Sequence, residues 1–156
     1  MRRAVLALGL LIGVGRGAGV SSFAVVVHPS NPTIGLRMRD LSAIFGGSVK
    51  QWQHGPKVVL IERQPESPSF RFLVARVLNT SASEYKRSLA SIEFRGETPV
   101  TLKILNSEAT ACKYMFYVPG AIALLETSSL SIPECSPLKV LTVDGKLPAQ
   151  DGYQLR

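Results

Sequence analysis

The residues with the clearest chemical potential are Arg63, Ser67 and Ser69, which occur as Arg63-x-x-x-Ser67-x-Ser69 between a predicted strand and a predicted helix. The first backbone N–H groups of a helix and the positive end of its dipole attract anions. The two hydroxyls can donate hydrogen bonds to an oxyanion, and the guanidinium four residues earlier can bind the same oxygens bidentately. The pattern therefore indicates an anion site. Two simpler readings remain open, ordinary Ser-Pro capping and a surface ion pair of Arg63 with Glu62 or Glu66.

A second candidate group is formed by Asn106 and Ser107, which precede the other well-marked helix. Both side chains can complete an anion site at the start of that helix. Simple N-capping is the more common role of these two residue types at a helix start.

The remaining reactive residue types form no recognisable catalytic arrangement. The two histidines, His28 and His54, lie in different segments with no Cys or carboxylate at metal-ligand spacing, so we expect neither a metal nor a cofactor. No Ser/His/acid order and no paired carboxylates stand out. We therefore expect a binding protein, not an enzyme.

The elements that must position these residues alternate between strands and helices. Short β-branched or apolar runs predict strands over residues 23–28, 57–62, 100–105, 121–125 and 138–143. Apolar residues at helical spacing predict helices over residues 39–45, from Ser67 to residue 78, from Ser83 to residue 92 and over residues 108–116. This alternation predicts an α/β layered domain with a sheet of about five strands.

The first residues have the features of a secretory signal peptide, with Arg2 and Arg3 before a short apolar run and then a stretch of small residues. We assign residues 1–22 to this signal and residues 23–156 to a single domain. An uncleaved N-terminal anchor is the alternative. The formal charge of +7 becomes +4 when Arg2, Arg3 and Arg16 are removed, and the remaining excess lacks the basic runs and interleaved aromatics of a nucleic-acid surface.

Export bears on the two cysteines, Cys112 and Cys135. Thiols in an oxidising compartment usually pair when they are close enough, which favours a structural disulfide. Two unpaired, buried thiols remain the alternative, because the sequence alone does not give the Cα separation that pairing needs.

Several short segments, in order and with matching spacing, resemble phosphate-type periplasmic substrate-binding proteins of ABC transporters. They are Val25-Val-Val-His-Pro-Ser-Asn-Pro32, Leu41-Ser-Ala-Ile-Phe45-Gly-Gly, Trp52-x-x-Gly55, Arg63-x-x-x-Ser67-x-Ser69-Phe70 and Pro119-Gly-Ala-Ile122. The resemblance covers nearly all of the chain after the signal and implies a single three-layer lobe of the periplasmic binding protein type II fold.

The resemblance also implies a function. In that family the Arg, Ser and Thr of an Arg-x-x-Gly-Ser-Gly-Thr loop hold the phosphate, which corresponds to Arg63, Ser67 and Ser69 here. Glu66 and Pro68 replace the two glycines, adding a negative charge and removing a backbone donor. The expected function is periplasmic recognition of phosphate or another small oxyanion, with an ABC permease as partner.

The alternative is an envelope accessory module that keeps the fold without tight ligand binding and contacts another envelope protein. A homodimer is open under both interpretations. We expect no nucleic-acid partner.

Overall fold

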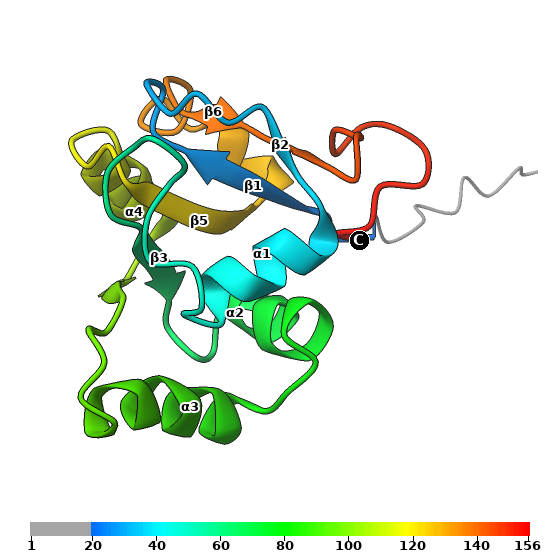
Figure 1. Ribbon diagram of the computed structural model, residues 1–156. Coiled ribbons are helices and arrows are strands. Elements are labelled where there is room, and N and C mark those ends of the chain that lie inside the picture. The colour runs from blue at the N-terminus through cyan, green and yellow to red at the C-terminus, as the bar shows by residue number, and fades with distance from the viewer. Residues whose placement is uncertain (1–19) are drawn as a thin grey trace, which may run out of the picture.

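A five-stranded sheet in the order β4-β3-β5-β1-β6 forms the centre of the protein (Figure 1). The computed structural model describes residues 20–156, so most of the predicted signal peptide lies outside the described residues. The strands are β1 (Phe23–Val27), β3 (Val59–Arg63), β4 (Thr101–Leu105), β5 (Ala121–Glu126) and β6 (Lys139–Val140). The predicted α/β class with a sheet of about five strands is confirmed.

The directions of these strands decide where functional groups can gather. Strand β3 runs parallel to both β4 and β5, whereas β1 runs antiparallel to β5 and to β6. The carboxyl ends of β3, β4 and β5 therefore lie at one edge of the sheet, together with the beginning of β1. All five residues of β1 are buried, as expected for a strand with a neighbour on each side and a covered sheet face above and below.

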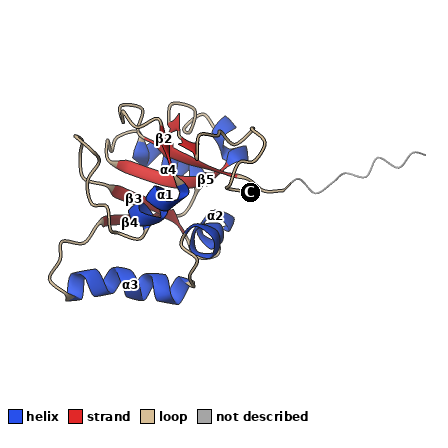
Figure 2. Cartoon of the chain, turned by 45° about the vertical axis from the view of Figure 1, so that its right-hand side comes forward, coloured by secondary structure: helices blue, strands red, loops and turns tan. Residues whose placement is uncertain are grey.

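Helices cover both faces of the sheet and complete three layers (Figures 1 and 2). They are α1 (Met38–Phe45), α2 (Pro68–Phe72), α3 (Ala82–Phe94) and α4 (Glu108–Met115), with a π turn η1 (Leu73–Val77) and a 3-10 turn η2 (Thr127–Ser131). One core cluster joins α1 and η1 to one face through residues such as Phe45 and Leu73. A second cluster joins α4 to the other face through residues such as Ala111 and Met115.

The predicted helix from Ser67 to residue 78 is present but changes its winding halfway. Ser67 caps α2 by accepting a hydrogen bond from the backbone N–H of Phe70, and Pro68 occupies the first helical position. The chain then widens into η1, where the N–H of Leu78 donates to the carbonyl of Leu73, five residues earlier. Apolar periodicity cannot distinguish this turn from an ordinary α-helical turn.

The predicted last strand, residues 138–143, is wrong as a single element. The structure divides it into β6, which pairs with β1, and β7 (Thr142–Val143), which pairs with β2 (Gly35–Leu36) in a separate two-stranded sheet. Between them the N–H of Leu141 donates to the carbonyl of Val25. The alternation of polar and apolar residues is the same for one strand or two, so the change of partner leaves no trace in the sequence.

The loop between α1 and β3 is held against the sheet by Trp52. Its side chain is 5% exposed, and the indole Nε1 donates to the carbonyl of Gly120 at 3.0 Å. The same carbonyl accepts from the backbone N–H of Val59, at the start of β3. A Cβ atom at Gly120 would lie 1.9 Å from the carbonyl oxygen of Lys57, so only glycine allows this close approach.

Cys112 of α4 and Cys135, which follows η2, are joined in a disulfide. Of the two alternatives left open by the sequence, the bonded pair is the one that the structure contains. Both residues belong to the core cluster on the α4 face, so the bond fastens the segment after η2 to that helix.

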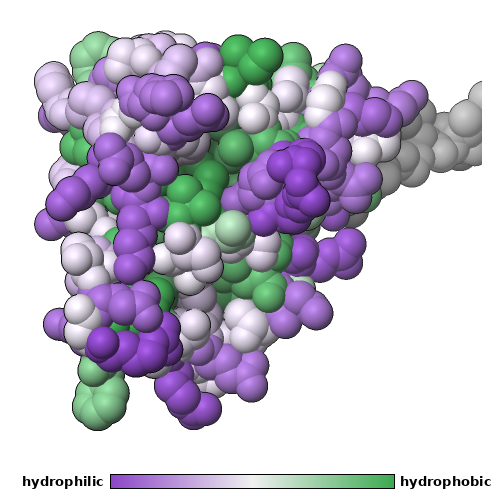
Figure 3. All heavy atoms as spheres, viewed as in Figure 1, coloured by the Kyte–Doolittle hydropathy of each residue, from purple (hydrophilic) through white to green (hydrophobic). Residues whose placement is uncertain are grey.

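The periphery of the protein is formed by α3 and β4. Strand β4 is the last strand of the sheet on its side, and α3 lies at the edge of the fold in both ribbon views (Figures 1 and 2). Phe94, at the end of α3, is 93% exposed. In the space-filling view, hydrophobic residues gather near the middle of the face and hydrophilic ones surround them (Figure 3). Among residues 20–156, no helix has the length and apolar character needed to cross a bilayer.

Candidate functional site

The candidate site lies at the edge where β3, β4 and β5 end. In open α/β sheets ligands bind outside the carboxyl ends of the parallel strands, where loops and helix starts converge. Here Arg63 is the last residue of β3, Leu105 is the last residue of β4 and Glu126 is the last residue of β5. The predicted ligand-binding residues lie at the end of β3 and on the segments that follow β3 and β4.

Arg63 is bound by the end of β4 and the start of α4. Its Nε donates to the carbonyl of Leu105 at 3.0 Å, and its Nη2 donates to the carbonyl of Asn106 at 2.9 Å. Its Nη1 lies 3.4 Å from Oε1 of Glu108, and the Arg63 side chain is 15% exposed. These contacts fix the guanidinium at the edge of the sheet, directed toward β4 and α4.

Ser67 and Ser69 form a separate pair on α2. Their hydroxyl oxygens are 3.4 Å apart, and Ser67 also caps the helix. Ser69 is almost fully buried, with 2% of the residue exposed. The hydrogen bonds and the ion pair of Arg63 all lead to β4 and α4, so the structure links Arg63 with Asn106 and leaves the two serine hydroxyls to each other.

Asn106 and Ser107 link the two halves of the edge and cap α4. The side-chain oxygen of Asn106 accepts a hydrogen bond from the amide of Gln64 at 2.9 Å. The hydroxyl of Ser107 accepts from the backbone N–H of Thr110 and donates to the Thr110 hydroxyl. Ser107 is thus a helix cap, as its residue type allows, and its hydroxyl is already engaged.

Glu108, which the sequence did not single out, is the partner of Arg63. Its side chain is 11% exposed, and both carboxylate oxygens are buried without an aligned hydrogen bond. Burial raises the pKa of Glu108, because a carboxylate loses hydration there. The Ser129 hydroxyl, the backbone of Glu126 and the charge of Arg63 lower the pKa and only partly offset this effect.

The charges at this edge are unequal. Residues 63–69, 105–108 and 126–131 contain one positive side chain, Arg63, and three carboxylates, Glu66, Glu108 and Glu126. Glu66 is exposed and Glu108 faces the guanidinium directly. An anion that approaches Arg63 therefore meets a neutralised pair with further negative charge nearby.

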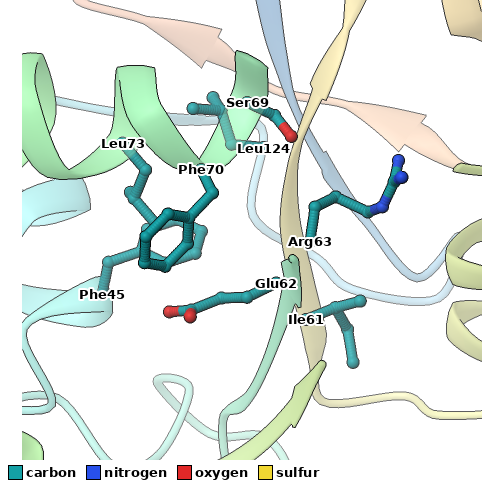
Figure 4. A pocket seen from close by; sticks show the side chains of 8 residues that line it. All are labelled: Phe45, Ile61, Glu62, Arg63, Ser69, Phe70, Leu73 and Leu124. Carbon is teal, nitrogen blue, oxygen red and sulfur yellow. The ribbon is translucent and has the colours of Figure 1, made fainter. Parts of the chain in front are cut away.

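Beneath the edge there is a cavity of about 10 Å³, lined by residues that include Glu62, Ser69, Phe70 and Leu124 (Figure 4). This volume corresponds to about one water molecule, so an oxyanion must bind on the open edge and not inside. Figure 4 also shows that Glu62 and Arg63 point to opposite sides of β3, as successive strand residues do. Glu62 is 4% exposed and makes no surface ion pair with its neighbour.

Glu62 instead contacts α3 through Tyr85. The Tyr85 hydroxyl lies against Oε1 of Glu62 and 3.0 Å from the carbonyl of Phe45. Burial is the main reason that the pKa of Glu62 rises to about 7, and burial beside this carboxylate raises the pKa of Tyr85. Lys86 is the charged group that favours the ionised form of Glu62.

Glu62, Tyr85 and Glu108 are the polar residues of this region that sequence reasoning missed. An acidic residue after a capping Ser, such as Glu108, normally indicates an exposed first turn that suits the helix dipole. A Glu at the end of an apolar strand, such as Glu62, is normally solvated. Their burial depends on η2 and α3, which are distant in sequence, so no local pattern predicts it.

No protein-family model matches the sequence. No curated protein sequence matches it either.

Solved structures do match the fold. An ABC-type phosphate transport receptor from Vibrio cholerae superimposes with a TM-score of 0.67 at 17% identity, over 86% of this chain and 53% of the receptor. PstS from Borrelia burgdorferi superimposes with a TM-score of 0.69 at 14% identity, over 86% of this chain and 54% of PstS. A phosphate-binding protein from Stenotrophomonas maltophilia gives 0.60 at 12% identity, over 82% and 40%.

The predicted fold resemblance to phosphate-type substrate-binding proteins is therefore confirmed. The chain spans about half the length of the first two solved structures, so it corresponds to one part of each.

Proposed function

We propose that this protein is a solute-binding module of the cell envelope that recognises phosphate or another small oxyanion at the edge formed by β3, β4 and α4. The observation that carries the proposal is the position of Arg63, which is held by two carbonyls while its Nη1 group makes no aligned hydrogen bond. A guanidinium fixed in this way can present the remaining N–H groups to an oxyanion. The fold neighbours, which are phosphate-binding proteins, support the same ligand class.

The proposed ligand set keeps Arg63 at its centre, with Ser67, Ser69, Asn106 and Ser107 around it. The cap at Ser107 and the pairing of the two other serines mean that these hydroxyls contribute only if they rearrange. We therefore propose weak binding. Cleavage of a signal at residues 1–22 and delivery to the periplasm, with an ABC permease as partner, form part of this proposal, as does a binding role without catalysis.

A direct test is titration with inorganic phosphate at low ionic strength, followed by calorimetry or by ¹⁵N NMR. Arg63→Ala removes the charged donors and is expected to weaken binding by at least about tenfold. Arg76→Ala is the matched control, because it removes the same charge from an exposed position on η1 and is expected to bind as the unchanged protein does. Circular dichroism checks that each variant is folded.

Arg63→Lys keeps the charge but loses the planar fork, so it is expected to restore only part of the affinity. Equal affinity in the Arg63→Ala and Arg76→Ala proteins would remove Arg63 from the site.

The excess of carboxylates at the same edge favours a second candidate, an envelope accessory module that keeps the fold without binding a ligand. If the unchanged protein gives no response to phosphate or sulfate under any condition, this second function replaces the first.

A further inference from the structure

We propose that the ionised Glu108 carboxylate competes with an oxyanion for Arg63, so that the proposed site binds the oxyanion more tightly once Glu108 has lost its charge. This inference rests on the function proposed above and describes how that site is regulated. Its basis is the 3.4 Å contact between Nη1 of Arg63 and Oε1 of Glu108, in a place where both side chains are mostly buried.

The carboxylate of Glu108 occupies the place beside Arg63 where the oxyanion would bind. Two of the guanidinium nitrogens of Arg63 are already bound to carbonyls, and the third faces Glu108. An incoming oxyanion needs the same N–H groups that face the carboxylate. While Glu108 is ionised, the two anions compete for one cation, and the internal one has no entropy of association to overcome.

The surroundings of Glu108 make its charge easy to lose. The groups that face it are Arg63 from β3, Glu126 from β5 and Ser129 from η2. Burial and the charge of Glu126 oppose the carboxylate, whereas Ser129, the backbone of Glu126 and the charge of Arg63 favour it, and both oxygens lack an aligned hydrogen bond. Burial raises the pKa of Glu108, so its charge is lost at a higher pH than that of an exposed glutamate.

Neither the buried carboxyl of Glu62 nor the imidazole of His28 faces this pair. Glu62 points to the opposite side of β3. His28 follows the carboxyl end of antiparallel β1, which lies at the opposite edge of the sheet.

The experiment measures sulfate binding at pH 7.5 and pH 5, because sulfate has the same charge at both values. For the unchanged protein we expect tighter binding at pH 5. Glu108→Gln removes the competing charge with little change in shape, so it is expected to bind sulfate about tenfold more tightly at pH 7.5 and to lose most of the pH dependence.

The matched control is Glu66→Gln, which removes the same charge from the same edge but from an exposed side chain. We expect it to leave the affinity within about twofold, because an exposed charge is screened. If Glu108→Gln and Glu66→Gln increased the affinity for sulfate equally, the effect would come from net charge alone, and the inference would be overturned. An affinity for sulfate in Glu108→Gln no higher than in the unchanged protein would also overturn it.

A second readout is the ¹⁵N resonance of the Arg63 Nε. It is expected to shift with pH in the unchanged protein and to stay constant in Glu108→Gln. A constant resonance in both proteins contradicts the inference while leaving sulfate binding intact. Absence of sulfate and phosphate binding in both proteins at both pH values removes the proposed function as well, so the two failures are distinguishable.

Discussion

The hydroxyl of Tyr85 has a single proton but lies against two acceptors, the carboxyl of Glu62 and the carbonyl of Phe45. If Glu62 is ionised, Tyr85 must donate to it, and the carbonyl of Phe45 loses its donor. If Glu62 is protonated, it can donate to Tyr85, which then donates to Phe45, and every group is satisfied. The protonated form is therefore the better fit to this buried site and helps to hold α3 against the body.

This arrangement predicts that stability depends on the charge of Glu62. The pKa of Glu62 is about 7 in the folded protein, above the ordinary value of 4.5. The folded state therefore binds the proton more tightly, and the stabilisation is fully present below pH 4.5 and is lost as the pH rises through 7. We expect the free energy of unfolding to fall by about 3 kcal/mol over this window. Urea unfolding at a series of pH values measures it.

Glu62→Gln keeps a donor for Tyr85 at every pH, so its unfolding free energy should lack this decline. Glu93→Gln, at an exposed position of α3, should retain it. A decline of equal size in all three proteins would assign the effect to other groups.

At the residue scale, the sequence names the candidate residues but not the groups that they contact. Arg63, Asn106 and Ser107 do lie at one edge, because parallel strands bring their carboxyl ends together. The sequence could not show that the strongest contacts of Arg63 are two backbone carbonyls and Glu108, which lie 42 to 45 residues further along the chain. Contacts of this kind depend on side-chain packing and leave no spacing pattern.

Among the elements, the loop before β3 depends most on one glycine. Gly120→Ala would place a Cβ 1.9 Å from the Lys57 carbonyl oxygen, so the backbone of β5 or of the loop must move. We expect the free energy of unfolding to fall by more than about 2 kcal/mol, as it does when a protein interior is overpacked. The measurement is the urea midpoint.

Gly96→Ala is the control. Gly96 has a φ of 72° but an added Cβ would meet nothing within 4 Å, so only backbone strain of about 1 kcal/mol is expected. If both variants lost the same unfolding free energy, the backbone around Gly120 would accommodate the added Cβ without further cost, contrary to this prediction.

The type of each element, helix or strand, was predictable from local patterns, whereas the strands with which each strand pairs were not. The helix that begins at Ser67 and the buried strand β1 follow directly from capping chemistry and apolar content. The division of residues 138–143 between two sheets depends on Val25 and β2, which are far away in sequence. Periodicity describes which face is buried and carries no information about which neighbour covers it.

At the scale of the whole molecule, the protection of backbone amides from hydrogen exchange should decrease from the middle of the sheet toward β4 and α3. Strand β1 is entirely buried and lies between two partners, whereas β4 is an edge strand with mostly exposed residues. We expect the amides of β1 and β5 to exchange with deuterium most slowly, and those of β4 and α3 much faster, in a hydrogen-exchange measurement.

If the amides of β4 exchanged as slowly as those of β1, this order would be contradicted, and the unpaired side of β4 would be covered in solution. Sedimentation analysis would then show whether a second copy provides the cover.

The overall architecture was predictable because strands and helices alternate and because short segments in the right order resemble a known fold. The solved structures confirm this at identities of 12% to 17%. Such identities preserve the hydrophobic pattern that specifies the layers. A shared fold does not determine the charges at the sheet edge, which decide whether an anion binds.

The single tryptophan of the sequence, Trp52, gives this protein an internal optical reporter. Its indole is buried and bound to Gly120 at the amino end of β5, whereas Arg63 and Glu108 lie at the carboxyl end of β3. Its emission should therefore shift to longer wavelength when the chain unfolds, yet respond little when an anion binds. Fluorescence is suited to the stability measurements, and affinities need a probe at the other end of the strands.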